Sequence, residues 1–248
     1  MVRPIGVFDS GVGGLNVLKH CAKLLPEESF IYLADKANMP YGNKPKEEIA
    51  RAAYACADTL FSLNCKAIVI ACNTATVTAA EQIRSLYSTR VVVGLEPAVR
   101  PCIKELGRRG YAVALVTSAT FSSERFRMLL ENDKRIVPIA APELAMMIES
   151  SKDDIPRLNQ YLSGIFRDYS DAEAVILGCS HYSYIADIIR DIYGGNIKIY
   201  DGAEGAARRL KYCLEISGLA AQKGETKPTI RFLSTYKKMQ NAESRMQN

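Results

Sequence analysis

Residues 67–74 read AIVIACNT, an apolar run that ends in a cysteine and is followed by two small polar residues. A short apolar run rich in β-branched residues is typical of a buried strand, and the segment 74–87 that follows it has apolar residues at helical spacing. We therefore expect Cys72 at the junction between a strand and a helix.

The same form recurs in the second half of the chain, where AVILGCSH (174–181) places Cys179 after another apolar run. Asn73 and Ser180 follow the two cysteines, and both are residue types that cap helices well. The two cysteines lie close to half the chain apart. Two α/β halves that face each other would direct both thiols into one cleft.

Short apolar runs and amphipathic segments alternate along the whole chain. This alternation predicts the α/β class, with two pseudo-symmetric domains, each a mostly parallel sheet flanked by helices, and an active site in the cleft between them. Ligands of such sheets bind at the carboxyl ends of the strands. The expected strands are 5–9, 29–35, 66–72, 90–96, 111–118, 135–140, 173–179, 196–201 and 229–236, and the expected helices are 15–25, 46–63, 74–87, 99–109, 122–133, 141–150, 155–170, 182–193 and 202–217. The residues expected at the carboxyl ends include Asp9, Asp35, Cys72, Glu96, Thr117 and Cys179.

Composition indicates a cytoplasmic globular protein. The chain has 248 residues, of which 48% are hydrophobic and 24% charged, as in ordinary soluble domains. No apolar run approaches the roughly 20 residues that span a bilayer. The first residues lack the apolar stretch of a signal peptide, so we expect no membrane partner.

Neither a metal site nor a nucleic-acid surface is expected. The 7 cysteines form no CxxC pair, and a reducing compartment disfavours disulfides. His20 and His181 are the only 2 histidines, which argues against a His-rich metal site. The net charge is +5, and most of the excess lies in the tail 221–248, which indicates a solvated basic segment rather than a nucleic-acid-binding face.

Two facing thiols suit proton transfer on both faces of a carbon atom. A helix N-terminus lowers a cysteine pKa from about 8.5 towards roughly 3.5–7.5. Because like charges oppose double ionisation, one thiolate and one thiol is the expected state. Such a pair can invert a stereocentre. A Cys-His hydrolase built on Cys179 and His181 is an alternative, but it leaves Cys72 unexplained.

The loop DSGVGG (9–14) does not fit a nucleotide cofactor. It lacks the third glycine of a dinucleotide fingerprint, since Asn16 stands there, and it has no G-K-[ST] of a P-loop. Its backbone N–H groups suit a small anion at a helix start, such as a substrate carboxylate. Asp9 beside it is a candidate for binding an ammonium group or for orienting a proton-transfer residue.

Several motifs together resemble the bacterial glutamate racemases, in that family's order and spacing from residue 5 to about 205. They are IGVFDSGVGGLNVLK (5–19), MPYGNK (39–44), VIACNTAT (69–76), VVGLEPAVRP (92–101) and VILGCSHYS (175–183), and the tail segment TIRFLSTY (229–236) is similar to the family's closing strand. The resemblance implies a cofactor-independent enzyme that makes D-glutamate for peptidoglycan, and usually a homodimer. It also implies a first domain of 1–96 completed by 206–248 and a second domain of 97–205.

The resemblance assigns site residues position by position. It implies that Cys72 and Cys179 are the acid/base thiols, supported by Asp9 and His181 respectively, and that Glu149 is a nearby catalytic carboxylate. The implied substrate-binding residues are Asp9, Ser10, Pro40, Tyr41, Gly42, Asn73, Thr74, Ser180 and His181.

The chain departs from the family pattern at a few positions near the site. Ser180 replaces the usual threonine, DKAN (35–38) replaces the frequent D-T-A-R, and YSYI (182–185) replaces the commoner Tyr-Pro. None of these changes removes a catalytic group. Aspartate racemisation, another reaction of the superfamily and a catalytically silent amino-acid-binding protein remain the alternative functions.

Overall fold

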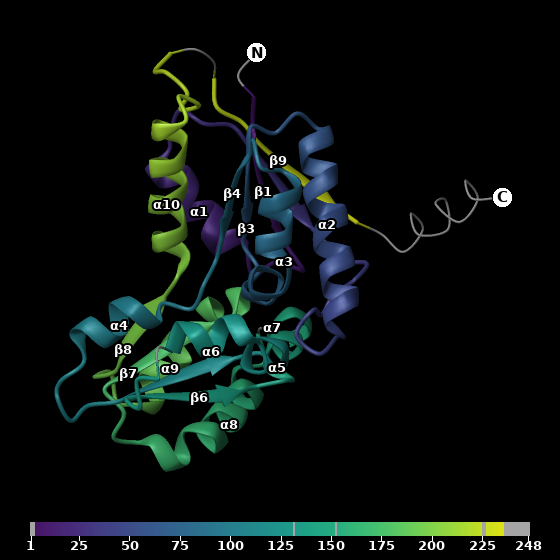
Figure 1. Ribbon diagram of the computed structural model, residues 1–248. Helices are drawn as coiled ribbons and strands as arrows, with labels where there is room; N and C mark the ends of the chain where they lie inside the picture. The colour runs from purple at the N-terminus through teal and green to yellow at the C-terminus, as the bar shows by residue number, and fades with distance from the viewer. Residues whose placement is uncertain (1–2, 131, 152, 225–226, 236–248) are drawn as a thin grey trace.

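The computed structural model describes residues 3–130, 132–151, 153–224 and 227–235, which form two lobes, one above the other in Figure 1. Each lobe is built on one parallel sheet, with strand order β4-β3-β1-β2-β9 in the first and β6-β5-β7-β8 in the second. All strand pairs in the two sheets are parallel. The predicted α/β fold class is confirmed.

The first lobe holds the N-terminal part of the chain, as far as β4, together with the last described helix and strand. Its elements are β1 (Ile5–Asp9), α1 (Leu15–Leu24), β2 (Phe30–Ala34), α2 (Lys46–Ser62), β3 (Ala67–Ile70), α3 (Asn73–Leu86), β4 (Val91–Gly94), α10 (Ala203–Ile216) and β9 (Ile230–Ser234). The predicted strand 229–236 is therefore β9. Tyr236 and the rest of the basic tail lie outside the described residues.

The second lobe follows the same plan. Its elements are α4 (Val99–Glu105), β5 (Ala112–Val116), α5 (Ser118–Phe121), α6 (Glu124–Leu130), β6 (Ile136–Ala140), α7 (Leu144–Ser151), α8 (Ile155–Phe166), η1 (Arg167–Tyr169), β7 (Ala174–Gly178), η2 (Ser180–Ile185), α9 (Ala186–Ile192) and β8 (Lys198–Asp201). Read in the opposite direction, its strand order is β8-β7-β5-β6, which repeats the order β4-β3-β1-β2 of the first sheet. The strands before Cys72 and Cys179, β3 and β7, therefore occupy equivalent places, as the repeated motif predicted.

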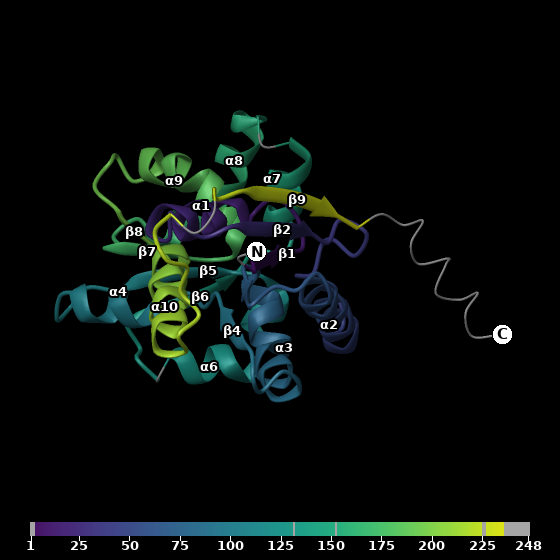
Figure 2. The ribbon, with the colours of Figure 1, turned by 90° about the horizontal axis from the view of Figure 1, so that it is seen from above.

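Helices cover both faces of each sheet, so the strands are buried on both sides. In the first lobe, α1 and α10 pack on one face and α2 and α3 on the other, each over its own apolar cluster (Figure 2). In the second lobe, α7, α8 and α9 cover one face and α4 and α6 the other. Burial on both faces explains why the strands are continuous apolar runs rather than alternating ones.

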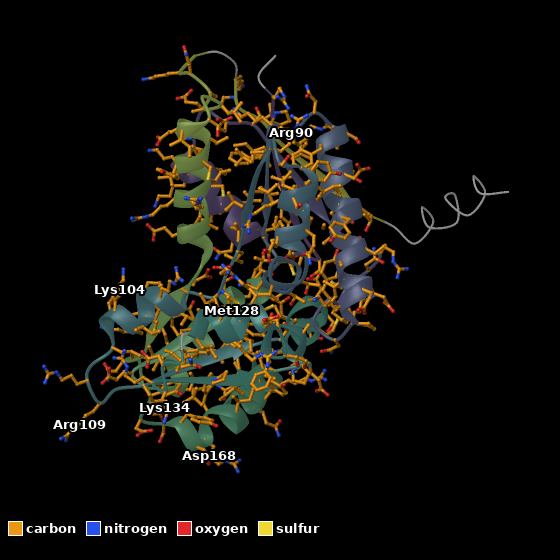
Figure 3. The ribbon with its side chains drawn as sticks, viewed as in Figure 1. Arg90, Lys104, Arg109, Met128, Lys134 and Asp168 are labelled. Atoms are coloured by element: carbon orange, nitrogen blue, oxygen red, sulfur yellow. The ribbon has the colours of Figure 1, made fainter. Side chains whose placement is uncertain are left out.

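Charged side chains surround the two lobes, and Lys104 and Arg109 project outward from the second lobe in Figure 3. No helix in the described part of the chain combines the length and apolarity that crossing a bilayer requires.

Two predicted helices are built differently from expectation. The predicted helix 122–133 corresponds to the shorter helix α6, and a helix that was not predicted, α5, precedes it, because the Thr117 side chain caps that earlier turn by accepting from the Thr120 N–H at 3.2 Å. The predicted helix 182–193 begins as the 3₁₀ segment η2 and becomes α-helical only at Ala186. Both α5 and η2 lie directly after strands whose ends reach the site.

A buried ion pair fastens the connection between α10 and β9. The Lys66 ammonium lies 2.6 Å from Glu28 Oε2 and also donates to the Leu219 carbonyl at 2.7 Å, and the Ala221 N–H donates to Glu28 Oε1 at 2.8 Å. Lys66 and Glu28 are 5% and 3% exposed. Removing one partner of such a pair leaves an uncompensated buried charge.

Lys66→Met should therefore lower the free energy of unfolding by about 3–5 kcal/mol, measured by urea denaturation. Lys211→Met is the matched control, because Lys211 lies 4.0 Å from Glu215 on an exposed helix face and surface pairs of this kind contribute less than about 1 kcal/mol. Equal losses in the two variants would contradict the interpretation of the buried pair.

Candidate active site

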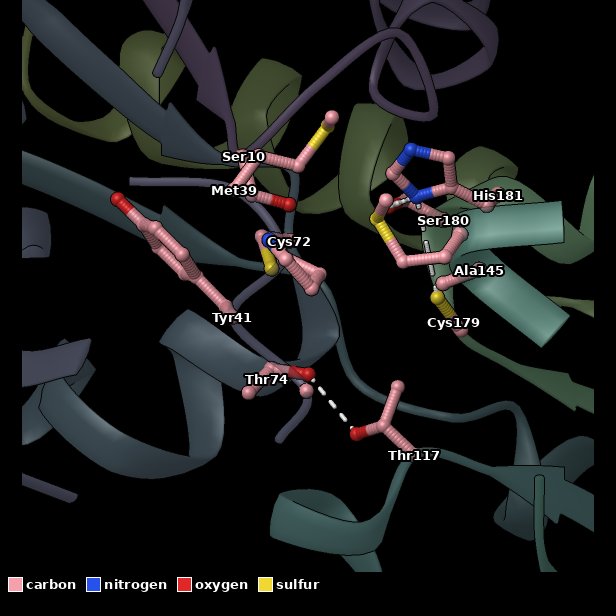
Figure 4. A pocket seen from close by; sticks show the side chains of 13 residues that line it. Ser10, Met39, Tyr41, Cys72, Thr74, Thr117, Ala145, Cys179, Ser180 and His181 are labelled. Carbon is pink, nitrogen blue, oxygen red and sulfur yellow. Dashed lines mark hydrogen bonds between the residues drawn. The ribbon is translucent and has the colours of Figure 1, made fainter. Parts of the chain in front are cut away.

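A pocket lies between the two lobes, at the carboxyl ends of their strands (Figure 4). Both lobes contribute to its walls, and both cysteines of the repeated motif reach it. Its lining residues are Ser10, Met39, Pro40, Tyr41, Gly42, Cys72, Thr74, Thr117, Ala145, Met146, Cys179, Ser180 and His181. The predicted cleft between two halves is therefore present and holds both thiols.

Cys72 enters the pocket from the first lobe, directly before α3. It occupies the N-cap position, and its Sγ accepts a hydrogen bond from the Ala75 N–H at 3.5 Å. The expectation that Asn73 caps this helix is wrong, because Asn73 is its first residue and the cysteine itself fills the cap. Ser180 likewise begins η2 after Cys179 at the N-cap.

The protonation of Cys72 also differs from expectation. Burial, followed by the negative charge of Asp9, holds the pKa of the Cys72 thiol well above its usual range, although the Ala75 N–H and the Ser10 hydroxyl act in the opposite direction. The predicted lowering of this pKa by the helix N-terminus is therefore outweighed. Only 4% of Cys72 is exposed, so water cannot solvate a thiolate there.

Cys179 enters from the second lobe beside a histidine–carboxylate pair. Its Sγ lies 4.0 Å from His181 Nδ1, and His181 Nε2 lies 2.8 Å from Glu149 Oε2. Burial alone would lower the pKa of His181, but the hydrogen bonds with Cys179 and Glu149 outweigh burial and hold this pKa well above its usual value. An imidazolium at this place donates one N–H to Glu149 and the other towards Cys179.

Glu149 connects this pair to the glycine loop of the other lobe. Its Oε2 accepts from the Val12 N–H at 3.1 Å as well as contacting His181. Burial acts to raise the pKa of Glu149, but the His181 and Val12 hydrogen bonds prevail and lower it. One N–H group of the loop thus binds a carboxylate of the protein itself. Binding of a substrate carboxylate by the loop stays a prediction.

Asp9 is a second carboxylate that joins the lobes. Its Oδ2 accepts from the Gly11 N–H at 2.9 Å, and its Oδ1 accepts from the Ser180 hydroxyl at 2.8 Å across the cleft. Asp9 is fully buried. Its carboxylate acts on Cys72 through charge, whereas its hydrogen bond in the second lobe is to Ser180.

The glycines of the loop are needed because the second lobe presses against its backbone. A Cβ added at Gly13 would lie 2.6 Å from both His181 Nδ1 and Ser180 Oγ and 2.7 Å from the His181 backbone nitrogen. A Cβ at Gly11 would lie 2.7 Å from Glu149 Oε2. The contact with the His181 backbone leaves no room for a side chain at Gly13, whereas a side chain at Gly11 would displace the Glu149 carboxylate, so this loop is where the first lobe packs closely against the second.

Further hydrogen bonds close the pocket on its other side. The hydroxyls of Thr74 and Thr117 lie 2.9 Å apart, one from each lobe (Figure 4). The Ala119 N–H donates to the Gly42 carbonyl at 3.0 Å, and Asn43 donates to the Pro142 carbonyl at 2.9 Å. The two lobes are thus held together around the pocket in this structure.

A family model described as Asp/Glu/Hydantoin racemase matches residues 5–210, a span that includes both cysteines, Asp9, Glu149 and His181. The chain belongs to the Asp/Glu/hydantoin racemase family. The resemblance to the bacterial glutamate racemases that the motifs suggested is confirmed by curated relatives and solved structures of that name.

One such relative, the glutamate racemase of Clostridium acetobutylicum, is 39% identical over 233 residues, covering 91% of this chain and 90% of the relative. A glutamate racemase isoform of Bacillus anthracis has a TM-score of 0.83 at 29% identity, covering 99% of this chain and 94% of that one. The Thermus thermophilus glutamate racemase in complex with beta-chloro-D-alanine has a TM-score of 0.81 at 34% identity, covering 95% and 88%.

Most of the site residues predicted for this racemase lie at the pocket. Asp9 and Glu149 stand behind its lining, each in contact with a lining residue. Asn73 is buried away from the lining, where its Nδ2 donates to the Leu95 carbonyl at 3.3 Å. A role for Asn73 in substrate binding stays a prediction, as do the roles of the other assigned residues.

The racemase pocket also has lining residues to which the sequence analysis gave no site role. Thr117 was expected at the carboxyl end of a strand, and it lines the pocket directly after β5, the counterpart of β1. Met39, Ala145 and Met146 carry no such signal, because alanine and methionine are ordinary core residues. Among the described residues, no cluster of three or more His, Cys, Asp or Glu side chains is placed to hold a metal.

Proposed function

We propose that the chain is a glutamate racemase that interconverts L- and D-glutamate without a cofactor, by two-base proton transfer between Cys72 and Cys179. The observation that carries the proposal is that the two cysteines come from equivalent strands of the two lobes and line the same pocket. Curated relatives named glutamate racemase and a solved Francisella tularensis glutamate racemase in complex with D-glutamate support the substrate.

In the proposed reaction, the thiolate of one cysteine removes the α-proton of glutamate, and the C–H bonding pair becomes a carbanion. The thiol of the other cysteine then donates its proton to the opposite face of that carbon. The first cysteine ends as a thiol and the second as a thiolate, so no atom or electron is gained or lost. The mirror substrate uses the same groups with the roles exchanged.

The barrier is high because the α-proton of an amino acid is very weakly acidic. Enzymes typically lower barriers by about 8–23 kcal/mol, and here positioning and electrostatic stabilisation are the available sources. Both thiols are buried, with 4% and 7% of Cys72 and Cys179 exposed. A thiolate deprived of water is a stronger base than a solvated one, which assists abstraction of a weakly acidic proton.

The helper groups divide between the two thiols in this proposal. His181, held by Glu149, donates towards Cys179 and eases its proton exchange. Together with burial, the negative charge of Asp9 raises the pKa of the Cys72 thiol, which makes its thiolate a stronger base. Ser10, Pro40, Tyr41, Gly42, Thr74 and Ser180 bind the substrate as part of the pocket lining, and Asn73 contributes from its buried place behind the pocket.

The proposed biological role is the supply of D-glutamate for peptidoglycan by a cytoplasmic homodimer. We further propose that 1–96 with 206–248 and 97–205 behave as the two domains. The strand β9, which pairs with β2, supports the return of the C-terminus to the first domain.

Chirality-resolved turnover on a panel of amino acids tests the proposed function. Purified enzyme should racemise both enantiomers of glutamate at rates well above those for aspartate, alanine and glutamine, with no added cofactor. Faster turnover of aspartate than of glutamate would mean that the substrate assignment is wrong and that the enzyme is an aspartate racemase. Binding of glutamate without any racemisation would instead support a catalytically silent amino-acid-binding protein.

A further inference from the structure

Asp35 is a buried carboxylate that stands directly behind one wall of the pocket. It follows β2 and is 1% exposed. Three side chains donate to its oxygens: Asn38 Nδ2 at 2.9 Å, the Tyr41 hydroxyl at 2.6 Å and the Thr235 hydroxyl at 2.5 Å. An ionised carboxylate only accepts hydrogen bonds, so all three donors are matched to it.

Tyr41 links this carboxylate to the pocket. Its ring forms part of the pocket wall with Pro40 and Gly42, and only 1% of the residue is exposed. Burial, together with the charge of Asp35, raises the pKa of Tyr41 well above its usual value, so the hydroxyl keeps its proton and remains a donor. The orientation of the ring is thus fixed by the bond to Asp35.

Thr235 brings the segment after β9 to the same point. It follows β9, and its N–H donates to the Ala34 carbonyl at 3.0 Å. Its hydroxyl donates to Asp35 and accepts from the Ala37 N–H at 3.1 Å, so one side chain holds both the carboxylate and the start of the loop. Thr235 and Asp35 are 200 residues apart in sequence.

The loop that carries the pocket wall has no regular structure of its own between β2 and α2. Its geometry therefore depends on contacts such as those of Asp35. The wall contributes to binding of the substrate rather than to proton transfer, because the Tyr41 hydroxyl is bonded to Asp35 and the reacting thiols lie elsewhere in the lining.

We propose that Asp35 and Thr235 are positioning residues, which set the substrate-binding wall of Pro40, Tyr41 and Gly42 from behind, so that the C-terminal strand takes part in substrate affinity. This inference rests on the proposed racemase function. It extends the site from the residues that line the pocket to Thr235, directly after β9.

Steady-state kinetics of Thr235→Val, Tyr41→Phe and their double variant test the proposal. Each single change removes one hydroxyl and keeps the side-chain shape, and KM for glutamate should rise about tenfold with kcat changed less than threefold, as expected for loss of a hydrogen bond to a charged group. In the double variant, KM should rise by a factor well below the product of the two single increases, because both hydroxyls act through Asp35.

Thr229→Val is the matched control, since it removes the same hydroxyl at the other end of β9, where Thr229 contacts Ser29 and not Asp35. Its KM should equal that of the unmodified enzyme. Asp35→Asn should reproduce the KM increase. If that variant does not fold, Thr235→Val and Tyr41→Phe still test the positioning role.

If the KM increases of the two single variants multiply in the double variant, the positioning role is overturned. The same holds if the variants have a lower melting temperature but an unchanged KM. If the unmodified enzyme does not racemise glutamate, the proposed substrate fails separately. The same variants are then measured with whichever amino acid of the panel is turned over, so the two failures remain distinguishable.

Discussion

Replacing either Cys72 or Cys179 by serine should abolish measurable racemisation while the fold persists. A serine hydroxyl is far less acidic than a thiol, so the variant loses either the base or the acid of each turnover. General acid–base groups typically contribute about 10²–10⁴-fold each, so kcat/KM should fall by at least a factor of this order in both directions. The loss of racemisation is measured by following the circular dichroism signal of D- or L-glutamate over time. Far-ultraviolet circular dichroism of the protein checks the fold.

The matched control is Cys213→Ser, which makes the same chemical change in α10, away from the pocket. It should retain the activity of the unmodified enzyme. The unmodified enzyme in D₂O offers a second check, because two bases on opposite faces place solvent deuterium in the product before it appears in the remaining substrate. Substantial turnover by either pocket variant, or early deuterium in the substrate, would refute the two-thiol mechanism.

The cysteine pair was predictable because the physical signals at 67–74 and 174–181 are strong and repeated. Buried parallel strands demand apolar runs, and the two runs lead to Cys72 and Cys179 at equivalent places in the two sheets. The repeat therefore indicated the shared cleft, and the alternation of strands and helices along the chain indicated the fold class. The loop 9–14 had already indicated Asp9, and the motif around Cys179 had indicated His181, so the family resemblance added only Glu149 and the helper roles. The structure brings all three side chains together around the two thiols.

Other features depend on tertiary contacts that no local pattern carries. Helical spacing cannot distinguish the 3₁₀ geometry of η2 from an α-helix, since apolar positions are similar in a single turn. Met146 enters the pocket only because α7 packs beneath η2, and its sequence context is that of a core helix. The roles of Asp35 and Thr235 require knowledge that β9 returns to β2.

The protonation of Cys72 shows why a local rule can fail in a closed site. The rule that a helix N-terminus favours a thiolate holds when the thiol is partly solvated. Here the thiol is buried and faces the charge of Asp9, so its pKa is raised. The thiol form is therefore favoured on the Cys72 side of the resting pocket. In the proposed mechanism, proton transfer that starts from Cys72 should then accelerate as rising pH removes the proton of this thiol.

The helper groups are arranged asymmetrically about the two thiols. His181 contacts Cys179 at 4.0 Å and is held by Glu149. Asp9 contacts the Gly11 N–H and Ser180, and it affects Cys72 through its charge. In the proposed mechanism each thiolate starts the reaction on one enantiomer only, so loss of a helper should affect one direction more than the other.

Asp9→Asn and His181→Asn should therefore slow catalysis with opposite directional bias. Each should lose a factor within the range of about 10²–10⁴ that acid–base assistance contributes, without erasing activity. Single-turnover exchange of the α-proton in D₂O, started separately from L- and D-glutamate, measures the two directions. The equilibrium constant between enantiomers stays at unity, so any asymmetry in kcat must be offset in KM.

Ser180→Ala separates the two ways in which Asp9 can act. This variant removes the hydroxyl that donates to Asp9 but leaves the carboxylate and its charge in place. If Asp9 assists Cys72 through charge, Ser180→Ala should lack the directional bias of Asp9→Asn. If Asp9→Asn and Ser180→Ala instead depress exchange from both enantiomers to the same degree, the assignment of Asp9 to Cys72 is wrong. Asp9 would then act by holding Ser180 and the glycine loop together across the cleft.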